Sequence, residues 1–479
     1  MDKINIYTAP SGAVSKDDFR VFVRNSGRPW EQLFVYEVKV DMHHVRQSSM
    51  VYFDMEGQVE VKVDSIKRPI HEAVIRPLSA SIPFEHTDQS IIFTLDRPQK
   101  LSIEINGDRF YNLHLFANPC EEDAPSPVDA NVLLINPAIH RTEDIYRMMA
   151  TPKIEGGQAP DTIYFAPGMH YLEETLLNIP SGKTVYIAGG AIVVGSLVCD
   201  RVKDVTIRGR GILYLSDFHR FSAFRGIRIV FSEKIVVEGI IALDPPHYSI
   251  YLGQSHYVDI RNFKSFSTRG WSDGIDMMSC SHINIEDVFL RTSDDCIAIY
   301  GSRWDFNGDT RHISVRNSVF WADVAHPLMI GTHGNHRGNG DTISDILFDN
   351  IDILEHHEPQ FNYMGAMAIN AGDYNTVRDV VYRNIRIEHF ELGRLIDLRV
   401  IFNKAYNPVP GYRIENIYFE DITYHGETKN YSQIFGYDDE RTINNVRFTR
   451  LTVNDKLILR PEQGMIEIND FVKGVSFEA

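Results

Sequence analysis

Cysteine, long apolar runs and positive charge are all scarce in this sequence. The four cysteines among the 479 residues are Cys120, Cys199, Cys280 and Cys296. They are too few and too widely spaced for a disulfide framework, and no Cys-x-x-Cys pair indicates a zinc site, so we expect reduced thiols. No segment approaches the roughly 18 consecutive apolar residues of a membrane-spanning helix.

The balance of charge excludes another group of partners. The chain has 48 lysines and arginines against 65 aspartates and glutamates, which gives a net charge of −17 and a pI of about 5.5. Such an acidic chain is a poor electrostatic match for nucleic acid or for an anionic membrane. The N-terminal residues Met1–Tyr7 lack the apolar core of a secretory signal. The sequence as it stands therefore predicts a cytoplasmic protein, or a secreted or periplasmic one if a leader has been removed.

Short strands separated by turns dominate the first 120 or so residues. Apolar and polar residues alternate along four segments: 33–40, 59–63, 91–95 and 101–105. This period of two, together with the turn signal Asn106-Gly107-Asp108, predicts an antiparallel β-sandwich. The acidic, proline-rich segment 120–128 has the composition of a linker. We therefore predict a β-sandwich domain over residues 1–122 and a second domain over residues 129–479.

From about residue 130 onward the sequence repeats a short unit of alternating β-branched residues, usually followed by Asn, Asp or Gly. Nine copies begin at Asp204, Lys234, Tyr257, His282, His312, Asp345, Asp379, Asn416 and Asn445. Strands at this irregular period, without helical periodicity, predict a parallel β-solenoid whose stacked coils share one core. We expect the residue after each strand to adopt left-handed geometry at a corner and, where it is Asn, to form a ladder between coils. The helical pattern of residues 140–150 predicts a cap on the N-terminal end.

Three aspartates lie about one coil apart in this repeat. Asp273 precedes Asp294 and Asp295 by 21 and 22 positions, so their carboxylates are expected to be neighbours on one surface. Nearby carboxyl groups are the chemistry of glycoside hydrolysis, in which one donates a proton to the leaving oxygen and another activates water. Mutual repulsion and partial burial are expected to raise at least one carboxyl pKa. Any one of these aspartates alone is explained equally well as a corner residue of the coil.

Three motifs surround these residues: Ser272-Asp-Gly-Ile-Asp276, Ser293-Asp-Asp-Cys-Ile-Ala-Ile299 and Ala325-His-Pro-Leu-Met-Ile-Gly331. In order, and in the spacing of the first two, they resemble the polygalacturonases, glycoside hydrolase family 28. The segment Leu243-Asp-Pro-Pro-His-Tyr248 is similar to the family's coil that lines the substrate groove one coil earlier. The resemblance implies a right-handed parallel β-helix and an inverting hydrolase.

One expected element of that family is absent. The family's Arg-x-Lys pair, which grips the carboxylate of galacturonate, would fall within residues 363–370, where no basic residue stands. Arg394 and Arg399 lie one coil later and are candidates to replace it. The N-terminal segments 74–79, 101–109 and 113–119 resemble the β-sandwich of the dextranase and isopullulanase group, glycoside hydrolase family 49. Members of that group act on neutral α-glucans, so this second resemblance implies a neutral substrate.

The resemblance also implies roles for the three aspartates. Asp294 corresponds to the general acid, and Asp273 and Asp295 correspond to the residues that hold and activate the attacking water. Inverting enzymes place their acid and base carboxyl groups about 6.5–9.5 Å apart to leave room for that water. Because consecutive residues of a flat strand point to opposite faces, Asp294 and Asp295 can both serve only if the backbone bends there or one of them acts indirectly.

The predicted substrate contacts are His326, His247, Tyr248, Tyr300, His333, Asn370 and Arg399. His326 matches the histidine of the third motif and is expected to hydrogen-bond an aspartate or a sugar hydroxyl. A buried histidine with a purely structural role is the alternative. The aromatic rings of this set, with Trp304, are candidate sugar platforms, and core or corner stacking explains each of them equally well. His333 lies in a glycine-rich stretch expected at the edge of the cleft. We expect no metal and no other cofactor.

Together these observations predict an inverting glycoside hydrolase that cleaves a neutral polysaccharide or oligosaccharide and is similar to dextranase and isopullulanase. A pectin hydrolase similar to polygalacturonase is the alternative within the same chemistry. A non-catalytic glycan-binding β-helix is the alternative of another class. A polysaccharide lyase is disfavoured, because the sequence predicts no basic residue beside the aspartates. The expected partner is a carbohydrate, and the sequence specifies neither exo or endo action nor an oligomeric state.

Overall fold

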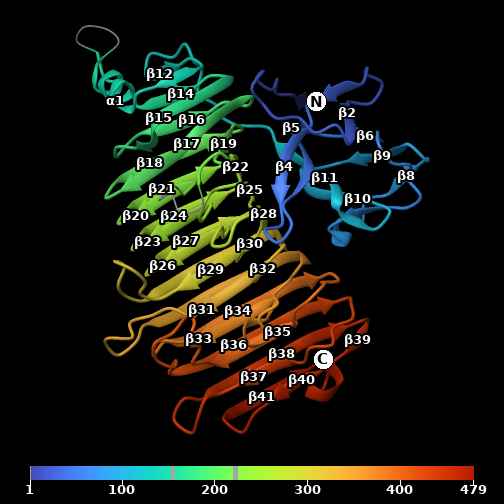
Figure 1. Cartoon of the computed structure of the whole chain (residues 1–479), viewed down its shortest axis with the longest axis vertical. Coiled ribbons are helices and arrows are strands. Elements are labelled where there is room, and N and C mark those ends of the chain that lie inside the picture. The colour runs from blue at the N-terminus through green and yellow to red at the C-terminus, as the bar shows by residue number, and fades with distance from the viewer. Residues whose placement is uncertain (1, 153–156, 220–224) are drawn as a thin grey trace.

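The computed structural model describes residues 2–152, 157–219 and 225–479. Figure 1 shows a long stack of strands that runs from β12 (Val132–Ile135) to β41 (Val472–Glu478), and a smaller N-terminal part against the side of its first half. β11 (Asp108–Pro119) is the last strand of the smaller part, so the predicted boundaries at residues 122 and 129 fall between β11 and β12 and stay a prediction. No helix within the described residues is long and apolar enough to cross a membrane.

The N-terminal part consists of two sheets. The first contains β1 (Lys3–Asn5), β4 (Tyr36–Val40), β5 (Arg46–Glu56), β7 (Ala73–Arg76), β10 (Gln99–Ile105) and β11. The second contains β2 (Phe19–Arg24), β3 (Glu31–Leu33), β6 (Val59–Ser65), β8 (Phe84–His86) and β9 (Ser90–Leu95). Side chains of both sheets, such as Phe53 and Val61, form one buried core, which confirms the predicted β-sandwich. The sandwich is not wholly antiparallel, because β5 and β11 pair in parallel.

The second part winds as a right-handed parallel β-helix, as predicted, and its strands form three faces. The first face contains β20 (Ile227–Val230), β23 (Ile250–Gly253), β26 (Ile275–Met278), β29 (Ile297–Tyr300), β31 (Leu328–Gly331), β33 (Met367–Ala371), β35 (Ile396–Val400), β37 (Ser432–Phe435) and β40 (Ile466–Ile468). The second face contains β12, β14 (Thr162–Phe165), β16 (Thr184–Ile187), β18 (Lys203–Gly209), β21 (Glu233–Glu238), β24 (His256–Arg261), β27 (Ser281–Glu286), β30 (Thr310–Ala322), β32 (Thr342–Glu355), β34 (Thr376–Ile387), β36 (Arg413–Tyr424), β38 (Ile443–Val453) and β41.

The third face contains β13 (Ala138–His140), β15 (Gly168–Asn178), β17 (Ala191–Asp200), β19 (Ile212–Tyr214), β22 (Ile241–Leu243), β25 (Lys264–Phe266) and β28 (Phe289–Thr292). Below β28 this face continues in the second half of β30, with which β28 pairs. A short strand, β39 (Lys456–Leu457), pairs antiparallel with β38.

All nine predicted repeat units lie on the second face, between β18 and β38. The first residue of every unit has a φ between 55° and 59°. The residues that end the units, such as Asn317 and Asn350, also have positive φ, and Asn, Asp and Gly adopt this left-handed geometry at little cost. Asn350 Nδ2 donates to Asn317 Oδ1 at 2.7 Å, which is one rung of the expected ladder. Each repeat unit is therefore a stretch of the second face that begins and ends at a left-handed residue.

The interior of the β-helix is an apolar column. Phe348, Tyr382, Phe419, Phe448 and Phe477 stack in succession with ring centroids 4.7–5.0 Å apart. This spacing equals the distance between neighbouring strands, about 4.7–4.9 Å, so equivalent residues of successive coils meet ring to ring.

A helix closes the column at its N-terminal end. α1 (Thr142–Ala150) lies within the predicted helical segment, and it buries Ile145 and Met149 in the same core as the coils. Cys199, Cys280 and Cys296 are buried in that core as free thiols, and Cys120 is also free.

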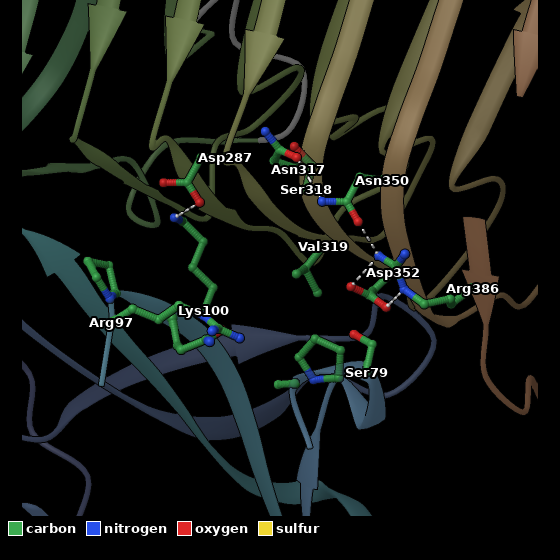
Figure 2. A pocket seen from close by; sticks show the side chains of 14 residues that line it. Ser79, Arg97, Lys100, Asp287, Asn317, Ser318, Val319, Asn350, Asp352 and Arg386 are labelled. Carbon is green, nitrogen blue, oxygen red and sulfur yellow. Dashed lines mark hydrogen bonds and ion pairs between the residues drawn. The ribbon is translucent and has the colours of Figure 1, made fainter. Parts of the chain in front are cut away.

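The sandwich packs its outer apolar surface against the third face of the β-helix. Tyr52 and Phe116 of the sandwich share a buried cluster with Phe289 of β28. Ion pairs flank the cluster, and Figure 2 shows one of them, in which Lys100 Nζ lies 2.5 Å from a carboxylate oxygen of Asp287. Because both faces of the sheet are covered around β5, that strand is buried on both sides rather than alternately.

Candidate active site

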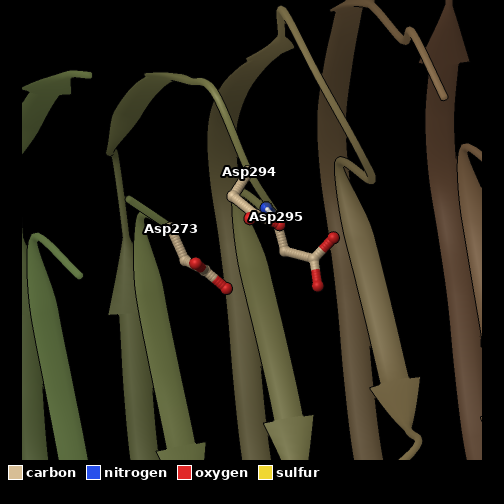
Figure 3. Close-up of side chains that lie close together, drawn as sticks. All are labelled: Asp273, Asp294 and Asp295. Atoms are coloured by element: carbon tan, nitrogen blue, oxygen red, sulfur yellow. Dashed lines mark hydrogen bonds between the residues drawn. The ribbon is translucent and has the colours of Figure 1, made fainter. Parts of the chain in front are cut away.

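Asp273, Asp294 and Asp295 come from two successive coils of the first face. Asp273 precedes β26, and Asp294 and Asp295 precede β29, which pairs in parallel with β26. One oxygen from each carboxyl group lies within 4.8 Å of the others. These oxygens are closer than the separation of about 6.5–9.5 Å expected for an inverting pair, so that expected spacing is not met. Figure 3 shows the three side chains gathered above these neighbouring strands. The backbone bends at residues 293–294, which allows both Asp294 and Asp295 to reach the same space.

A cavity of about 650 Å³ lies over the aspartates. Its aromatic lining consists of Tyr248, Trp271, Tyr300, Trp304, Tyr363 and Tyr406. Met42 and His43 also line it, and they belong to the loop of the sandwich that joins β4 to β5. The docked sandwich therefore builds part of the wall, and both parts of the chain form this cavity.

Burial and mutual repulsion raise the pKa values of the carboxyl groups in this cluster. Burial and the neighbouring Asp295 raise the pKa of Asp294 to about 6. Burial and the carboxylates of Asp276, Asp294 and Asp295 raise the pKa of Asp273 well above its ordinary value. Asp276 is fully buried, and burial raises its pKa as well, although Arg303 lies 3.9 Å away. The cluster therefore retains protons near neutral pH, as a general acid requires.

His326 holds Asp295 from within the coil. Its Nδ1 lies 2.6 Å and its backbone N lies 3.1 Å from Asp295 Oδ1, and its Nε2 lies 2.5 Å from the Tyr363 carbonyl oxygen. Since both ring nitrogens face acceptors, both carry a proton. Burial lowers the pKa of His326, but the charge of Asp295 outweighs it and raises that pKa to about 9. The ring is fully buried and absent from the described lining of the cavity, a position that favours holding Asp295 over the predicted contact with sugar.

Arg303 brings a positive charge to the same cavity. Its Nη1 donates to Tyr248 Oη at 2.7 Å, and its guanidinium carbon lies 4.9 Å from the ring centroid of Tyr300 and 4.6 Å from that of Trp304. The expectation that no basic residue lies beside the aspartates is therefore wrong. Burial lowers the pKa of Arg303, but Tyr248, Tyr300 and Asp276 raise it above the ordinary value, so Arg303 is a fixed cation and not a base.

Four of the predicted substrate contacts line the cavity: His247, Tyr248, Tyr300 and His333. Asn370 and Arg399 are not among the described residues that line it. Asn370 Nδ2 donates to Asp397 at 3.1 Å, and Arg399 Nε donates to the same carboxylate at 2.9 Å. Arg394 also pairs with Asp397, at 3.1 Å. Because one buried carboxylate engages all three, their positions do not support the predicted contact with sugar or a substitute carboxylate clamp.

The segment where the family's Arg-x-Lys pair was sought, residues 363–370, contributes only Tyr363 to the described lining of the cavity. Alternate residues of β33 point into the core of the coil, and Ala368 packs on the other side in a small cluster with Met329, Tyr363 and Tyr406. The rings of Tyr363 and Tyr406 are stacked with centroids 4.7 Å apart. Aromatic side chains therefore cover this part of the face.

Met42, His43, Arg303 and Glu358 also line the cavity, and no sequence pattern predicted them as site residues. Arg303 follows the candidate Tyr300 by three positions, so its proximity in the chain was a usable signal. Glu358 is buried, and burial raises its pKa to about 7 against the opposing charge of His326. No local pattern singles out Glu358 or the sandwich loop, because only the packing of distant segments brings them here.

The three aspartate oxygens are also close enough to share a hard cation such as Ca²⁺ or Mg²⁺. The raised pKa values of Asp273 and Asp294 disfavour this, because metal ligands must be deprotonated. The expectation that the site works without a metal stays a prediction.

The chain around this cavity matches a known family. Residues 223–455 match the model of Glycosyl hydrolases family 28. The matched segment contains the three aspartates, His326 and Arg303, and the match confirms the resemblance carried by the motifs. Exopolygalacturonase B of Aspergillus niger is 23% identical over 245 residues, which cover 46% of this chain and 53% of that relative. The chain thus spans about half the length of the curated relatives it matches.

Solved structures share the fold of the whole chain. Dex49A from Penicillium minioluteum superposes with a TM-score of 0.68 at 14% identity, over 98% of this chain and 96% of that one. A family 28 exopolygalacturonase from Yersinia enterocolitica superposes with a TM-score of 0.51 at 11% identity, over 93% of this chain and 99% of that one. At these identities the likeness concerns the fold.

Proposed function

We propose that this protein hydrolyses glycosidic bonds in the cavity over Asp273, Asp294 and Asp295. The observation that carries the proposal is the convergence of three carboxyl oxygens within 4.8 Å of one another in a cavity of about 650 Å³. A pair of carboxyl groups at different protonation states is what glycoside hydrolysis requires. The match of residues 223–455 to a glycosyl hydrolase family supports this function.

In this proposal Asp294 is the general acid. Its pKa of about 6 leaves a protonated fraction near neutral pH, and its side chain is partly exposed to the cavity. The backbone N–H groups of Trp271 and Asp295 donate to its two oxygens at 2.8 Å and 3.0 Å, which hold the carboxyl group in place. The proton passes from Asp294 to the glycosidic oxygen as the bond to the leaving sugar breaks.

Asp295 and Asp273 hold the attacking water. Asp295 Oδ1 already accepts two hydrogen bonds from His326, so its Oδ2 remains for the water, with the Tyr300 hydroxyl 3.5 Å away. Two hydrogen bonds of about 2.8 Å that meet at one water at the tetrahedral angle span about 4.5 Å, which matches the separation of at most 4.8 Å between the oxygens. The water adds to the anomeric carbon and gives its proton to Asp295, and attack opposite the leaving group would invert the anomeric centre. The carboxyl oxygens lie closer together than in most inverting pairs and nearer to the roughly 5–5.5 Å of retaining pairs, so the spacing does not support inversion and the anomer of the product decides it.

A neutral glycan is the substrate that we favour. The place of the family's carboxylate clamp is occupied by Ala368 under the stacked rings of Tyr363 and Tyr406. Arg394 and Arg399, the candidate replacements, are paired with Asp397.

A galacturonan is the alternative substrate. Arg303 is a partly buried cation on the wall of the cavity, and it could attract a sugar carboxylate. The curated relatives that match half of this chain are named exopolygalacturonases. Both substrates use the same acid and the same water, so a direct assay separates them.

The test is a screen of reducing-sugar release from dextran, pullulan, polygalacturonate, arabinan and galactan, with Asp294→Asn as control. We expect release from a neutral glycan, and a loss of about 10²–10⁴-fold in the variant. Proton NMR of the fresh product should show the inverted anomer. Release from polygalacturonate alone would support the pectin alternative. Binding of a glycan without any release by the unaltered protein would overturn the hydrolase in favour of a glycan-binding module.

A further inference from the structure

A charged residue of the sandwich joins it to two successive coils of the β-helix. Arg109, on β11, donates from Nη1 to Glu355 and from Nη2 to Glu391. Glu355 is the last residue of β32 and is buried, whereas Glu391 lies between β34 and β35 and is half exposed. A planar guanidinium presents five N–H donors in a fixed fork, so one arginine can hold both carboxylates at once.

The segment 355–358 connects these carboxylates to the catalytic cavity. Its sequence is Glu-His-His-Glu. Glu355 Oε1 accepts the backbone N–H of Glu391 at 2.8 Å, and His357 Nδ1 lies 2.8 Å from Glu391 Oε2. Glu358, the last residue of the segment, lines the cavity. Arg109 therefore stands at one end of a continuous network whose other end is the cavity wall.

The same segment holds the turn that precedes His326. The Ala325 N–H donates to the His357 carbonyl oxygen at 2.8 Å, and His356 Nδ1 lies 2.8 Å from the Ala325 carbonyl oxygen. The next residue, His326, holds Asp295 through its backbone N–H and its ring. A displacement of the segment 355–358 would therefore be transmitted to Asp295.

The sandwich loop on the other side of His357 belongs to the same wall. His43 lines the cavity, and its ring centroid lies 5.9 Å from that of His357. Arg109 is not among the described residues that line the cavity. Arg109 can therefore affect the reaction only through the residues that it holds.

We propose that Arg109 of the sandwich is a positioning residue for the proposed hydrolysis. By pairing with Glu355 and Glu391 it holds the segment 355–358 in place, and this segment holds the turn that carries His326. The sandwich is then part of the catalytic apparatus as well as part of the cavity wall. The inference rests on the proposed function for its effect on rate.

Titratable groups surround the cavity end of this network. Against the effect of burial, the charges of Asp295 and Glu358 raise the pKa of His326 to about 9. Burial and the charge of His326 lower the pKa of His356 to about 3. A displacement of Glu358 would therefore release the proton of His326 at a lower pH. The other charged groups that face the network are Arg76, Glu355, Glu391, His357, Asp294 and Arg394.

The test removes Arg109 and, separately, a second cation of the same interface. Arg109→Met removes both ion pairs and keeps an extended side chain. Lys100→Met is the matched control, because Lys100 pairs with Asp287 across the same interface but lines a different cavity (Figure 2). We expect Arg109→Met to lower kcat roughly tenfold with little change in KM, since a small misplacement of a reacting group slows the chemical step. The acid limb of the pH profile of kcat/KM should move to higher pH, and Lys100→Met should change neither.

A second readout does not depend on hydrolysis. The downfield proton resonance of His326 Nδ1–H, assigned by its absence in His326→Gln, is followed by NMR as pH rises. We expect this resonance to disappear at a lower pH in Arg109→Met, because Glu358 no longer stays close to His326. The loss of a cation alone would favour the protonated ring and move the titration to higher pH. The direction of the change therefore separates displacement of the segment from a simple change in charge.

The outcomes separate the positioning role from the hydrolase. Equal changes in Arg109→Met and Lys100→Met, or an unchanged kcat and His326 resonance, would overturn the role of Arg109 even if the unaltered protein cleaves a glycan. A resonance that titrates at a lower pH only in Arg109→Met, in a protein that cleaves nothing, would retain the held segment and overturn the hydrolase. If Arg109→Met melts more than a few degrees below Lys100→Met, the half-exposed Glu391 is tested instead. Glu391→Gln must then move the resonance in the same direction, or the proposal is rejected.

Discussion

Aspartates at the regular corners of the β-helix differ in environment from those that precede β26 and β29. Asp421, at a corner of the second face, is exposed, and the guanidinium of Arg450, 2.6 Å away, lowers its pKa. Asp273 and Asp294 meet other carboxylates in a buried bend, where their pKa values rise. Asp421 provides the left-handed backbone conformation that a corner requires. Asp273 and Asp294 instead lie beside other carboxylates, and the raised pKa values keep a proton available for acid catalysis. The partners that the fold supplies, and not the residue type, decide which of the two an aspartate becomes.

The largest expected effect comes from removing the carboxylate of Asp295, the proposed base beside β29. Asp295→Asn should lower kcat by about 10²–10⁴-fold on whichever polysaccharide is cleaved, because the water loses its proton acceptor. Asp421→Asn should leave kcat unchanged. Initial rates at saturating substrate check both variants, and equal losses in the two would remove the distinction between corner and bend.

The next effect concerns the protonated His326, which hydrogen-bonds to Asp295. His326→Gln should lower kcat by roughly 10–100-fold, because Asp295 loses hydrogen bonds from a charged donor. The acid limb of the pH profile of kcat/KM should also move to higher pH. A loss of rate with an unshifted limb would mean that His326 has only a structural role.

The third effect is the dependence of rate on pH in the unaltered protein. The pKa of Asp294 is about 6 without substrate, and the acid must be protonated, so kcat/KM should fall roughly tenfold per pH unit as pH rises above about 6. A constant kcat/KM between pH 6 and pH 8 would assign the acid to another group, and Glu358, with a pKa of about 7, is the first to examine.

The fourth effect is a gain in stability. The folded protein binds a proton at Asp273 more tightly than the unfolded chain does, because its pKa is raised. Stability is therefore lost as pH rises from the ordinary carboxyl pKa of about 3.9 towards the folded value. Asp273→Asn should raise the melting temperature at pH 7 by a few degrees, and the gain should vanish at pH 4. An equal gain at both pH values would have a cause other than charge.

The smallest expected effect is the change in stability when the corner residue Asp421 is replaced. The pKa of Asp421 is lowered, so its pairing with Arg450 contributes above the ordinary carboxyl pKa and is lost as pH falls through the folded value. The pair is exposed to solvent and salt, so Asp421→Asn should change stability at pH 7 by less than about 1 kcal/mol. A larger loss in thermal unfolding would mean that corner aspartates also support the coil.

The parts of the site that the sequence revealed are those that short motifs encode. The spacing of Asp273 from Asp294 and Asp295 indicated that they meet, because one coil of the β-helix returns to the same face. Asn370 and Arg399 were expected at the substrate, but both bond to Asp397, and no local pattern shows which of several acceptors a long side chain will reach.

The amino-acid sequence by itself determined the coil, since left-handed corner residues and alternating β-branched residues act over a few neighbouring positions. It also determined which carboxylates stack, because the rise per coil is constant. Only the tertiary structure decided the surroundings of those carboxylates. The docking of the sandwich brings Met42 and His43 to the cavity wall, and the packing of separate loops brings Arg303 and Glu358. Burial and charge depend on every segment that folds against a group, so protonation and substrate access are properties of the assembled chain.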